Sequence, residues 1–287
     1  MILAADLHAR LDAPVIAVMV NWNGKAFLAP SLASVLAELA PVGGRLLLID
    51  NDSSDGSTAF VAAEFPDVVV HQTGANLGGA GGFSTGMRIA LDCPRCTSIW
   101  LLDNDIVVEP GALAPLLACL VAHPDAGACG SQICLYDRPQ VVQEIGARYS
   151  PWLGALAQCH SGGVRVAPAT APWPVDYLAA CSVLIRRECL AATGTFADIF
   201  IFYDDVEWGL RAQSLGWHLW AVPRSVIRHQ FSATKPTVAW REYYRKRNRL
   251  AVLVAHPPRR GGLLAVLLYV WFVSYLVLTT RWRGRAA

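Results

Sequence analysis

The stretch that decides the fold is Ser98-Ile-Trp-Leu-Leu-Asp-Asn-Asp-Ile106, in which an apolar run ends abruptly in Asp103, Asn104 and Asp105. Its strand-favouring residues predict a buried strand that delivers two carboxylates to the edge of a sheet. Open α/β sheets bind ligands at the carboxyl ends of their strands, so a substrate is expected at this edge. The carboxylate oxygens suit a hard divalent ion that also holds phosphate oxygens. An ordinary turn after a strand fits the same residues, because Asp and Asn commonly open turns.

Upstream of this stretch and just after it, short apolar runs alternate with segments of helical spacing. The expected strands are 15–20, 45–49, 68–70 and 98–103, and the expected helices are 27–39, 57–65, a helix running through Ala90, and 110–121. This alternation predicts an α/β fold with a mainly parallel sheet that helices cover on both faces.

The pattern loosens between Gly127 and about Pro174, where short strands and loops are expected. Further on, the sequence predicts strands at 175–185 and 217–222, a helical turn at 187–192, a helix with an acidic first turn after Ile201, and a helix at 237–256. We therefore expect a sheet domain over 1–236 and a helical segment over 237–287.

Composition limits the partners and the compartment. The 287 residues are 54% hydrophobic and 16% charged, with a net charge of +2, so no general affinity for nucleic acid is expected. The eight cysteines form neither a disulfide framework nor a set at zinc spacing, which predicts buried, reduced thiols and a cytosolic location. The first residues, 1–12, lack the pattern of a signal peptide.

A glycine cluster at Gly78-Gly-Ala-Gly-Gly82 raises the question of a dinucleotide site. The Rossmann fingerprint directly follows the first strand, whereas here that strand ends in Asn21-Trp-Asn-Gly24. The sequence also has no Gly-Lys-Ser/Thr phosphate loop. We therefore exclude NAD and expect a flexible loop over a phosphate, or a helix start that offers free N–H groups.

Six motifs in order resemble the family-2 glycosyltransferases, which have the GT-A fold, over about 15–249. They are VNWNG (20–24), LLLIDNDSSDGS (46–57), NLGGAGGFSTGM (76–87), WLLDNDIVVEPGAL (100–113), FYDDVEWGLRA (202–212) and the later Arg228-His229. NLGGAGGF and DDVEWGLRA look most like the bacterial galactofuranosyltransferases, and rhamnosyltransferases share much of the scaffold. Departures such as Asn104, where galactofuranosyltransferases tend to have Asp, leave the donor sugar more open than the reaction type.

The resemblance assigns roles to the residues at the strand ends. It implies a divalent metal, Mn²⁺ or Mg²⁺, held by Asp103, Asp105 and His229. The expected residues of the nucleotide-sugar site are Asn21, Asn51, Asp52, Asp55, Asn76, Gly79, Asp103, Asn104 and Trp208. Each of these roles has a purely structural alternative: residues 50–56 would only form a turn, His229 would be a hydrogen-bonded surface residue, and Trp208 would lie in the core.

Two adjacent acids at the predicted helix start provide a base for an acceptor hydroxyl. Adjacent carboxylates repel each other, which raises the pKa of one of them towards a useful range. By resemblance Asp205 is the base, and Asp204 orders the site or the acceptor. One base without an obvious nucleophile implies a single displacement with inversion. An ordinary acidic first turn is the alternative.

The C-terminal segment is basic and apolar. From Arg241 onward Glu242 is the only acid among many Arg and Lys, and the uncharged stretch 261–280 lies between basic flanks. This pattern predicts an anchor on an anionic membrane surface, lying in it or spanning it, with a contact to a second subunit as the competing interpretation. Arg245, Arg247 and Arg249 are expected to meet the diphosphate of a polyprenyl-linked or glycan acceptor.

These observations predict an inverting, metal-dependent glycosyltransferase at the cytoplasmic face of the plasma membrane, either peripheral or tail-anchored, that builds a bacterial surface glycan. UDP-galactofuranose is the favoured donor and dTDP-rhamnose the alternative. A nucleotidyltransferase would share the strand-end carboxylates and the ion. A membrane-attached carbohydrate-binding scaffold is the alternative outside the enzymes.

Overall fold

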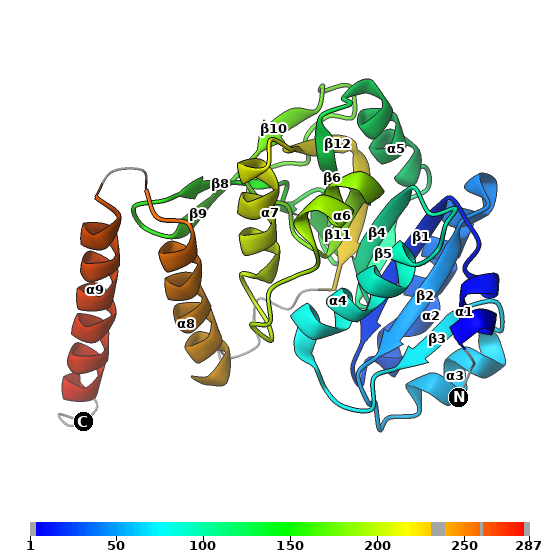
Figure 1. Ribbon diagram of the computed structural model, residues 1–287, viewed down its shortest axis with the longest axis horizontal. Coiled ribbons are helices and arrows are strands. Elements are labelled where there is room, and N and C mark those ends of the chain that lie inside the picture. The colour runs from blue at the N-terminus through cyan, green and yellow to red at the C-terminus, as the bar shows by residue number, and fades with distance from the viewer. Residues whose placement is uncertain (1–3, 231–238, 259–260, 284–287) are drawn as a thin grey trace.

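The computed structural model describes residues 4–230, 239–258 and 261–283. A large sheet with the strand order β10-β12-β6-β11-β4-β1-β2-β3 organises the chain, and two short strands, β5 and β7, pair with β12 and β6 (Figure 1). Its strands are β1 (Val15–Asn21), β2 (Arg45–Asp50), β3 (Val69–Gln72), β4 (Ser98–Asp103), β5 (Ile106–Val108), β6 (Ala126–Leu135), β7 (Val142–Glu144), β10 (Trp173–Val175), β11 (Ser182–Arg186) and β12 (His218–His229). A separate hairpin consists of β8 (Ala147–Ser150) and β9 (Ala155–Gln158).

The sheet is mixed but mainly parallel, as predicted. Strands β3, β2, β1, β4, β6 and β12 run in one direction, whereas β11, which lies between β4 and β6, is antiparallel to both. Two local predictions around β11 were wrong. The region after Gly127, where we expected short strands and loops, opens with the long strand β6, and the strand expected at 175–185 is broken into β10 and β11. The break, residues 176–181, faces the candidate site described below.

Helices cover both faces of the sheet, as predicted. They are α1 (Ala4–Arg10), α2 (Lys25–Leu39), α3 (Ser57–Glu64), α4 (Gly78–Leu91), α5 (Leu113–Ala122), α6 (Arg187–Thr193), α7 (Asp204–Ser214), α8 (Ala239–Ala255), α9 (Gly262–Arg283) and the 3-10 turn η1 (Ala40–Val42). One apolar core joins α1, α4, α6 and α7 to one face of the sheet, and a second joins α2, α3 and α5 to the other. Alternate side chains of β1 enter the two cores, as period-2 strand geometry requires.

The glycine cluster lies within the first turns of α4 and therefore forms a helix start, one of the two predicted outcomes. A Cβ on Gly82 would lie 2.7 Å from a methyl group of Val20, and one on Gly86 would lie 2.2 Å from a methyl group of Val18. Glycine is needed at these two positions because α4 packs directly against β1.

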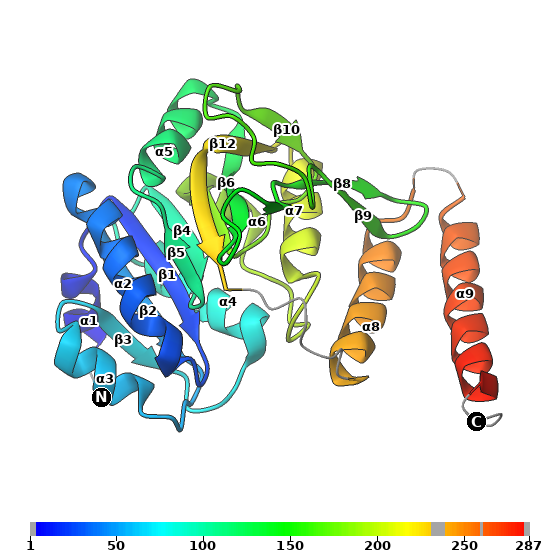
Figure 2. The ribbon, with the colours of Figure 1, turned by 180° about the vertical axis from the view of Figure 1, so that it is seen from behind.

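The last two helices run side by side at one end of the molecule, with α8 nearer the sheet (Figures 1 and 2). Leu253 of α8 is buried against Ala265 and Tyr269 of α9. The predicted boundary between 236 and 237 lies outside the described residues. Among the described residues, one helical window, Lys25–Val42, is long and apolar enough to cross a membrane, but it spans α2 and η1, and the buried face of α2 is part of the core.

Candidate active site

Three strand ends bring the predicted metal ligands together. Asp103 ends β4, Asp105 lies in the turn before β5, and His229 ends β12, where it is paired with Ile106 of β5. The His229 Nε2 atom is 3.1 Å from an oxygen of Asp105. One ligand atom each from Asp103, Cys181 and His229 lies within 4.8 Å of the others. Residues far apart in the sequence thus converge on one point at the sheet edge.

The carboxylates at this point crowd one another. Burial and the neighbouring charge of Asp105 raise the pKa of Asp103 to about 6. Burial lowers the pKa of His229, but the hydrogen bond to Asp105 and the charges of both acids outweigh it, so the pKa is raised overall. The other ring nitrogen, Nδ1, lies 3.1 Å from the Gln143 side-chain oxygen. Both ring nitrogens thus face oxygens, an arrangement that a doubly protonated ring or a cation at Nε2 satisfies.

This donor set suits a divalent metal. Carboxylate oxygens are ligands that Mn²⁺ and Mg²⁺ sites both use, and the imidazole nitrogen favours the transition metal Mn²⁺; a cation would also relieve the repulsion between Asp103 and Asp105. The Cys181 thiol is a softer group, and burial raises its pKa well above the ordinary value, so it stays protonated. We infer that Asp103, Asp105 and His229 would hold the ion, while Gln143 fixes the orientation of the imidazole.

A cleft of about 440 Å³ opens beside these ligands. Its polar lining includes five of the predicted donor-site residues: Asn51, Asn76, Gly79, Asp103 and Asn104. The remaining lining is largely aromatic and comes from Val20, Trp22, Gly78, Phe83, Phe200, Ile201, Trp240 and Tyr244. A polar floor with aromatic walls is the composition expected of a site that binds a base and a sugar.

The polar floor is pre-arranged by side-chain hydrogen bonds. Asn21 is fully buried, donates to Asp50 at 2.9 Å and accepts from Asn104 at 2.7 Å. Asn51 donates to the Gly78 carbonyl at 2.9 Å and so ties β2 to the start of α4. A Cβ on Gly24 would lie 2.0 Å from the Asn104 amide nitrogen, which explains the glycine at that position.

Of the three other predicted donor-site residues, Asp55 and Trp208 have structural partners. The Asp55 carboxylate accepts hydrogen bonds from the Lys25 backbone and from Ser57, and so caps the starts of α2 and α3. Asp52 is exposed, with a positive φ of 63°, in the turn after β2. Trp208 is 3% exposed, and its ring nitrogen donates to Thr193 and Gly194. It lies in the core and does not line the cleft, so its predicted contact with the donor has no support in this geometry.

The acidic pair lies at the start of α7, as predicted, but this helix start is not exposed. Asp204 is 7% exposed, and burial together with the charge of Asp205 raises its pKa well above the ordinary value. Burial raises the pKa of Asp205 to about 6, although its oxygens accept backbone hydrogen bonds from Ala180 at 3.2 Å and Val206 at 2.9 Å. A fixed carboxylate with this pKa suits a general base near neutral pH.

Several residues near the acids were not found from the sequence. Glu144 is 6% exposed and accepts a hydrogen bond from Gln158 at 2.8 Å. The buried Tyr177 hydroxyl interacts with Asp205. Glu144 comes from the region where the sequence pattern loosens, and Tyr177 lies in the break between β10 and β11, where we expected a continuous strand. Trp22 lines the cleft and was not predicted either, although it directly follows the first predicted strand.

The buried acid predicts a stability effect that depends on pH. Burial and the charge of Asp205 raise the pKa of Glu144 from 4.5 to about 7. The folded protein therefore holds this proton more tightly than the unfolded chain, and stability is lost as pH rises from 4.5 through 7, by roughly 3 kcal/mol. Glu144→Gln removes the charge, so at pH 8 in EDTA we expect its unfolding temperature to exceed that of the wild type by a few degrees, with no gain at pH 4.5.

Thermal unfolding of both proteins between pH 4.5 and 8 checks this expectation. Glu64→Gln, at an exposed position on α3, is the matched control and should follow the wild type. If the unfolding temperature of the wild type does not fall relative to that of Glu144→Gln between pH 4.5 and 8, the raised pKa of Glu144 is contradicted.

The three arginines predicted to contact the acceptor lie on α8 and tie it to the rest of the molecule. Arg247 donates to the Ile199 carbonyl at 2.7 Å, and Arg249 donates to the Leu153 carbonyl at 2.6 Å. Arg245 forms an ion pair with Glu242 and lies 4.7 Å from the centre of the Phe202 ring. Arg245 and Arg247 are nevertheless exposed, so their guanidinium groups remain accessible to an anion.

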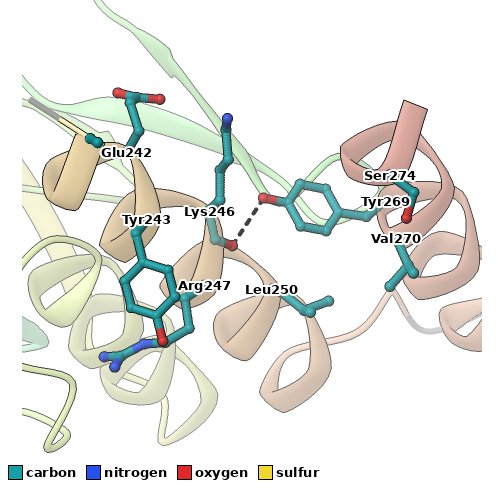
Figure 3. Close-up of a pocket in the computed structure, with 9 residues that line it drawn as sticks. Glu242, Tyr243, Lys246, Arg247, Leu250, Tyr269, Val270 and Ser274 are labelled. Carbon is teal, nitrogen blue, oxygen red and sulfur yellow. Dashed lines mark hydrogen bonds between the residues drawn. The ribbon is translucent and has the colours of Figure 1, made fainter. Parts of the chain in front are cut away.

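A second cavity, of about 500 Å³, lies between α8 and α9 (Figure 3). Tyr243, Lys246 and Leu250 line it from α8, and Tyr269 and Val270 line it from α9. The Tyr269 hydroxyl donates to the Lys246 carbonyl at 3.1 Å and joins the two helices. The cavity is therefore a mainly apolar space whose charged lining residues are Glu242, Lys246 and Arg247.

Comparison with known proteins agrees with this geometry. The family described as "Glycosyltransferase like family 2" matches residues 13–251. Galactofuranosyltransferase GlfT2 of Mycolicibacterium smegmatis is 27% identical over 214 residues, which are 69% of this chain and 33% of that protein. N-acetylglucosaminyl-diphospho-decaprenol L-rhamnosyltransferase of Mycobacterium tuberculosis is 29% identical over 241 residues, 75% of each chain. This chain thus spans about a third of the GlfT2 relatives.

Two solved structures share the fold. GalNAc-T7, determined with UDP, GalNAc and Mn²⁺, aligns over 84% of this chain and 47% of its own, with a TM-score of 0.64 and 17% identity. The mannosyltransferase PcManGT from Pyrobaculum calidifontis, determined with GDP-Man and Mn²⁺, aligns over 96% of this chain and 80% of its own, with a TM-score of 0.56 and 16% identity. At these identities the likeness shows the GT-A fold alone.

Proposed function

The chain belongs to the family-2 glycosyltransferases, and from this premise we propose that it is a metal-dependent, inverting enzyme that transfers galactofuranose from UDP-galactofuranose. The convergence of Asp103, Asp105 and His229 beside the 440 Å³ cleft, with Asp205 close enough to raise the pKa of Asp103, carries the proposal. This is the arrangement that a nucleotide-diphosphate sugar and an incoming hydroxyl would need.

The proposed reaction is one displacement. The acceptor oxygen forms a bond to the anomeric carbon of the sugar while the bond from that carbon to the diphosphate oxygen breaks. Asp205 takes the hydroxyl proton, and the nucleoside diphosphate leaves with the electron pair. A bound divalent ion supplies Lewis-acid stabilisation of the diphosphate charge. In this reaction Asn51, Asn76 and Asn104 would orient the donor.

The choice of donor rests on the relatives. The GlfT2 proteins are named galactofuranosyltransferases, and the motifs NLGGAGGF and DDVEWGLRA point the same way. The M. tuberculosis relative named as a rhamnosyltransferase covers more of its own length, so dTDP-rhamnose is the second candidate. Family membership makes the nucleotidyltransferase and the non-catalytic scaffold the weaker alternatives.

A thermal-shift screen tests the proposal. UDP-galactofuranose, dTDP-rhamnose, UDP-galactose and GDP-mannose would each be added with and without Mn²⁺ or Mg²⁺, since a ligand that binds the folded state raises the unfolding temperature. We expect the largest metal-dependent shift with UDP-galactofuranose, followed by release of UDP on turnover. A larger rise in unfolding temperature with dTDP-rhamnose would identify dTDP-rhamnose as the donor. The absence of any rise with every nucleotide sugar would refute the proposed function.

We also propose that the acceptor is a lipid-linked glycan and that the enzyme works on the inner face of the plasma membrane. The cavity between α8 and α9 combines apolar walls with Lys246 and Arg247, and the acid in its lining, Glu242, is paired with Arg245, which together suit an isoprenoid diphosphate. On α9, Leu263 is 75%, Leu267 56% and Trp271 65% exposed, a stripe of large apolar side chains at helical spacing. Such a stripe beside basic residues favours contact with an anionic bilayer.

The exposed stripe gives a prediction about membrane attachment. Deleting residues from Gly261 onward, or replacing Leu263, Leu267 and Trp271 together by Gln, should move the protein from membranes to the soluble fraction. The triple variant is the sharper test, because it leaves Ala265 and Tyr269 packed on α8. Fractionation and sedimentation with anionic vesicles measure the effect.

The control removes exposed apolar side chains from other faces of the protein. Val121 is 82% and Leu215 55% exposed, and their joint replacement by Gln should leave the distribution unchanged. If the triple variant fractionates like the wild type, α9 is instead a contact helix for another subunit.

A further inference from the structure

The loop at 199–203, directly before the proposed base, has a strained backbone. Phe200, Phe202 and Tyr203 have φ values of 70°, 64° and 67°. Bulky residues with a side chain rarely adopt this left-handed conformation, which persists only where the surroundings hold it. Tyr203 is also the N-cap of α7, so the backbone of this loop sets where Asp204 and Asp205 lie.

Asn248 of α8 holds this loop from one side. Its side chain is fully buried, and its Nδ2 lies 3.1, 2.7 and 2.9 Å from the backbone carbonyl oxygens of Ile199, Ile201 and Phe202. The Asn248 oxygen accepts from Arg247 Nε at 2.8 Å, so the orientation of the amide is fixed. The neutral amide of Asn suits this position because it donates hydrogen bonds to the loop carbonyls and accepts one from Arg247.

The start of α4 holds the loop from the other side. The Phe200 carbonyl accepts from the Ala80 N–H at 3.1 Å, and a Cβ on Gly78 would lie 2.2 Å from the same carbonyl oxygen. Phe200 also stacks on Tyr244 of α8, with ring centres 5.1 Å apart. The loop is thus clamped between α4 and α8, and Asn248 supplies the larger share of the bonds to its backbone.

We propose that Asn248 is a positioning residue for the transfer step. It keeps the loop at 199–203 in its strained conformation and thereby fixes the start of α7 that presents Asp205. The inference rests on the proposed function, and it adds α8 to the catalytic architecture. A carboxylate displaced by about 1 Å from its working geometry costs about 10²-fold in rate.

The test compares Asn248→Asp with Asn248→Ala in the full-length protein. Asp has the same shape but places one carboxylate oxygen, in the position of Nδ2, against three carbonyl oxygens. Ala removes the donor without adding charge, so it serves if the Asp variant does not fold. Val254→Ala, at a 57% exposed position on α8, is the matched control. We expect kcat for transfer to fall about 10- to 10²-fold in both Asn248 variants. Phe200 and Ile201 also line the donor cleft, so metal-dependent UDP affinity should fall too, but by a clearly smaller factor than kcat.

A double-mutant cycle separates positioning from general damage. Because Asn248 acts through Asp205, adding Asn248→Ala to Asp205→Asn should lower kcat less than about threefold further. An equal loss in both backgrounds, or an unchanged kcat in the single variants, would overturn the inference.

Hydrogen exchange of the peptide covering 199–206 provides a readout that needs no activity. We expect faster exchange in both Asn248 variants and wild-type exchange in Val254→Ala. Faster exchange in a protein that transfers no sugar from any donor would count against the proposed function, whereas unchanged exchange would overturn the role of Asn248.

Discussion

Asp105→Ala is expected to lower transfer by about 10³-fold or more, and to remove the metal-dependent part of the affinity for UDP. Asp105 lies 3.1 Å from His229 and shares the strand-end site with Asp103, so its loss leaves the ion with too few carboxylate ligands. The removal of one of two repelling acids should not weaken the fold.

Calorimetric titration of UDP with and without Mn²⁺ measures the binding effect directly. Asp67→Ala is the matched control, since Asp67 is exposed in the loop before β3. Metal-dependent UDP binding that survives in Asp105→Ala would show that the ion is held elsewhere.

Asp205→Asn should lower kcat by about 10²- to 10⁴-fold, the usual contribution of a general base, with little change in affinity for the nucleotide sugar. The amide cannot take the proton, and the donor contacts lie on other strands. Asn keeps one carbonyl oxygen for the N–H of Val206 or Ala180 but not for both. The unfolding temperature must therefore be measured alongside the rate.

The pH dependence adds a second signature. With the pKa of Asp205 raised to about 6, wild-type transfer should fall as the pH drops through 6, because the protonated acid cannot act as a base. Asp204→Asn should raise the acceptor KM more than it lowers kcat. If Asp204→Asn is inactive while Asp205→Asn remains active, Asp204 is the base and Asp205 orders the acceptor. If both variants remain active, the base is another residue.

The sequence predicted the parts of the site that lie at strand ends. Asp103, Asp105 and the Asn51 turn follow strongly apolar runs, and parallel strands bring such ends to one edge of a sheet. His229 came only from the family resemblance, since its place beside Asp105 depends on the pairing of β12 with β5, more than a hundred residues apart.

The remaining parts depend on contacts that no local pattern encodes. Glu144 and Tyr177 reach the site because β6 and the antiparallel β11 insert between β4 and β12, an insertion that the sequence pattern did not predict. Trp240 and Asn248 reach it because α8 folds back onto the loop before α7. Such long-range packing is decided by the total burial of the chain and not by periodicity within one segment.

The hydrogen bonds between Asn248 and the loop before α7 also decide where this chain can be recombined. A chimera made by joining residues 1–236 to the C-terminal helices of another transferase would pair one protein's loop with another protein's clamp. Its nucleotide floor, built from β1, β2 and α4, would remain intact, and the mismatch would fall on the wall that Phe200, Ile201, Trp240 and Tyr244 supply to the cleft. Any exchange of the C-terminal helices therefore requires 199–214 and α8 to be transferred together as one module.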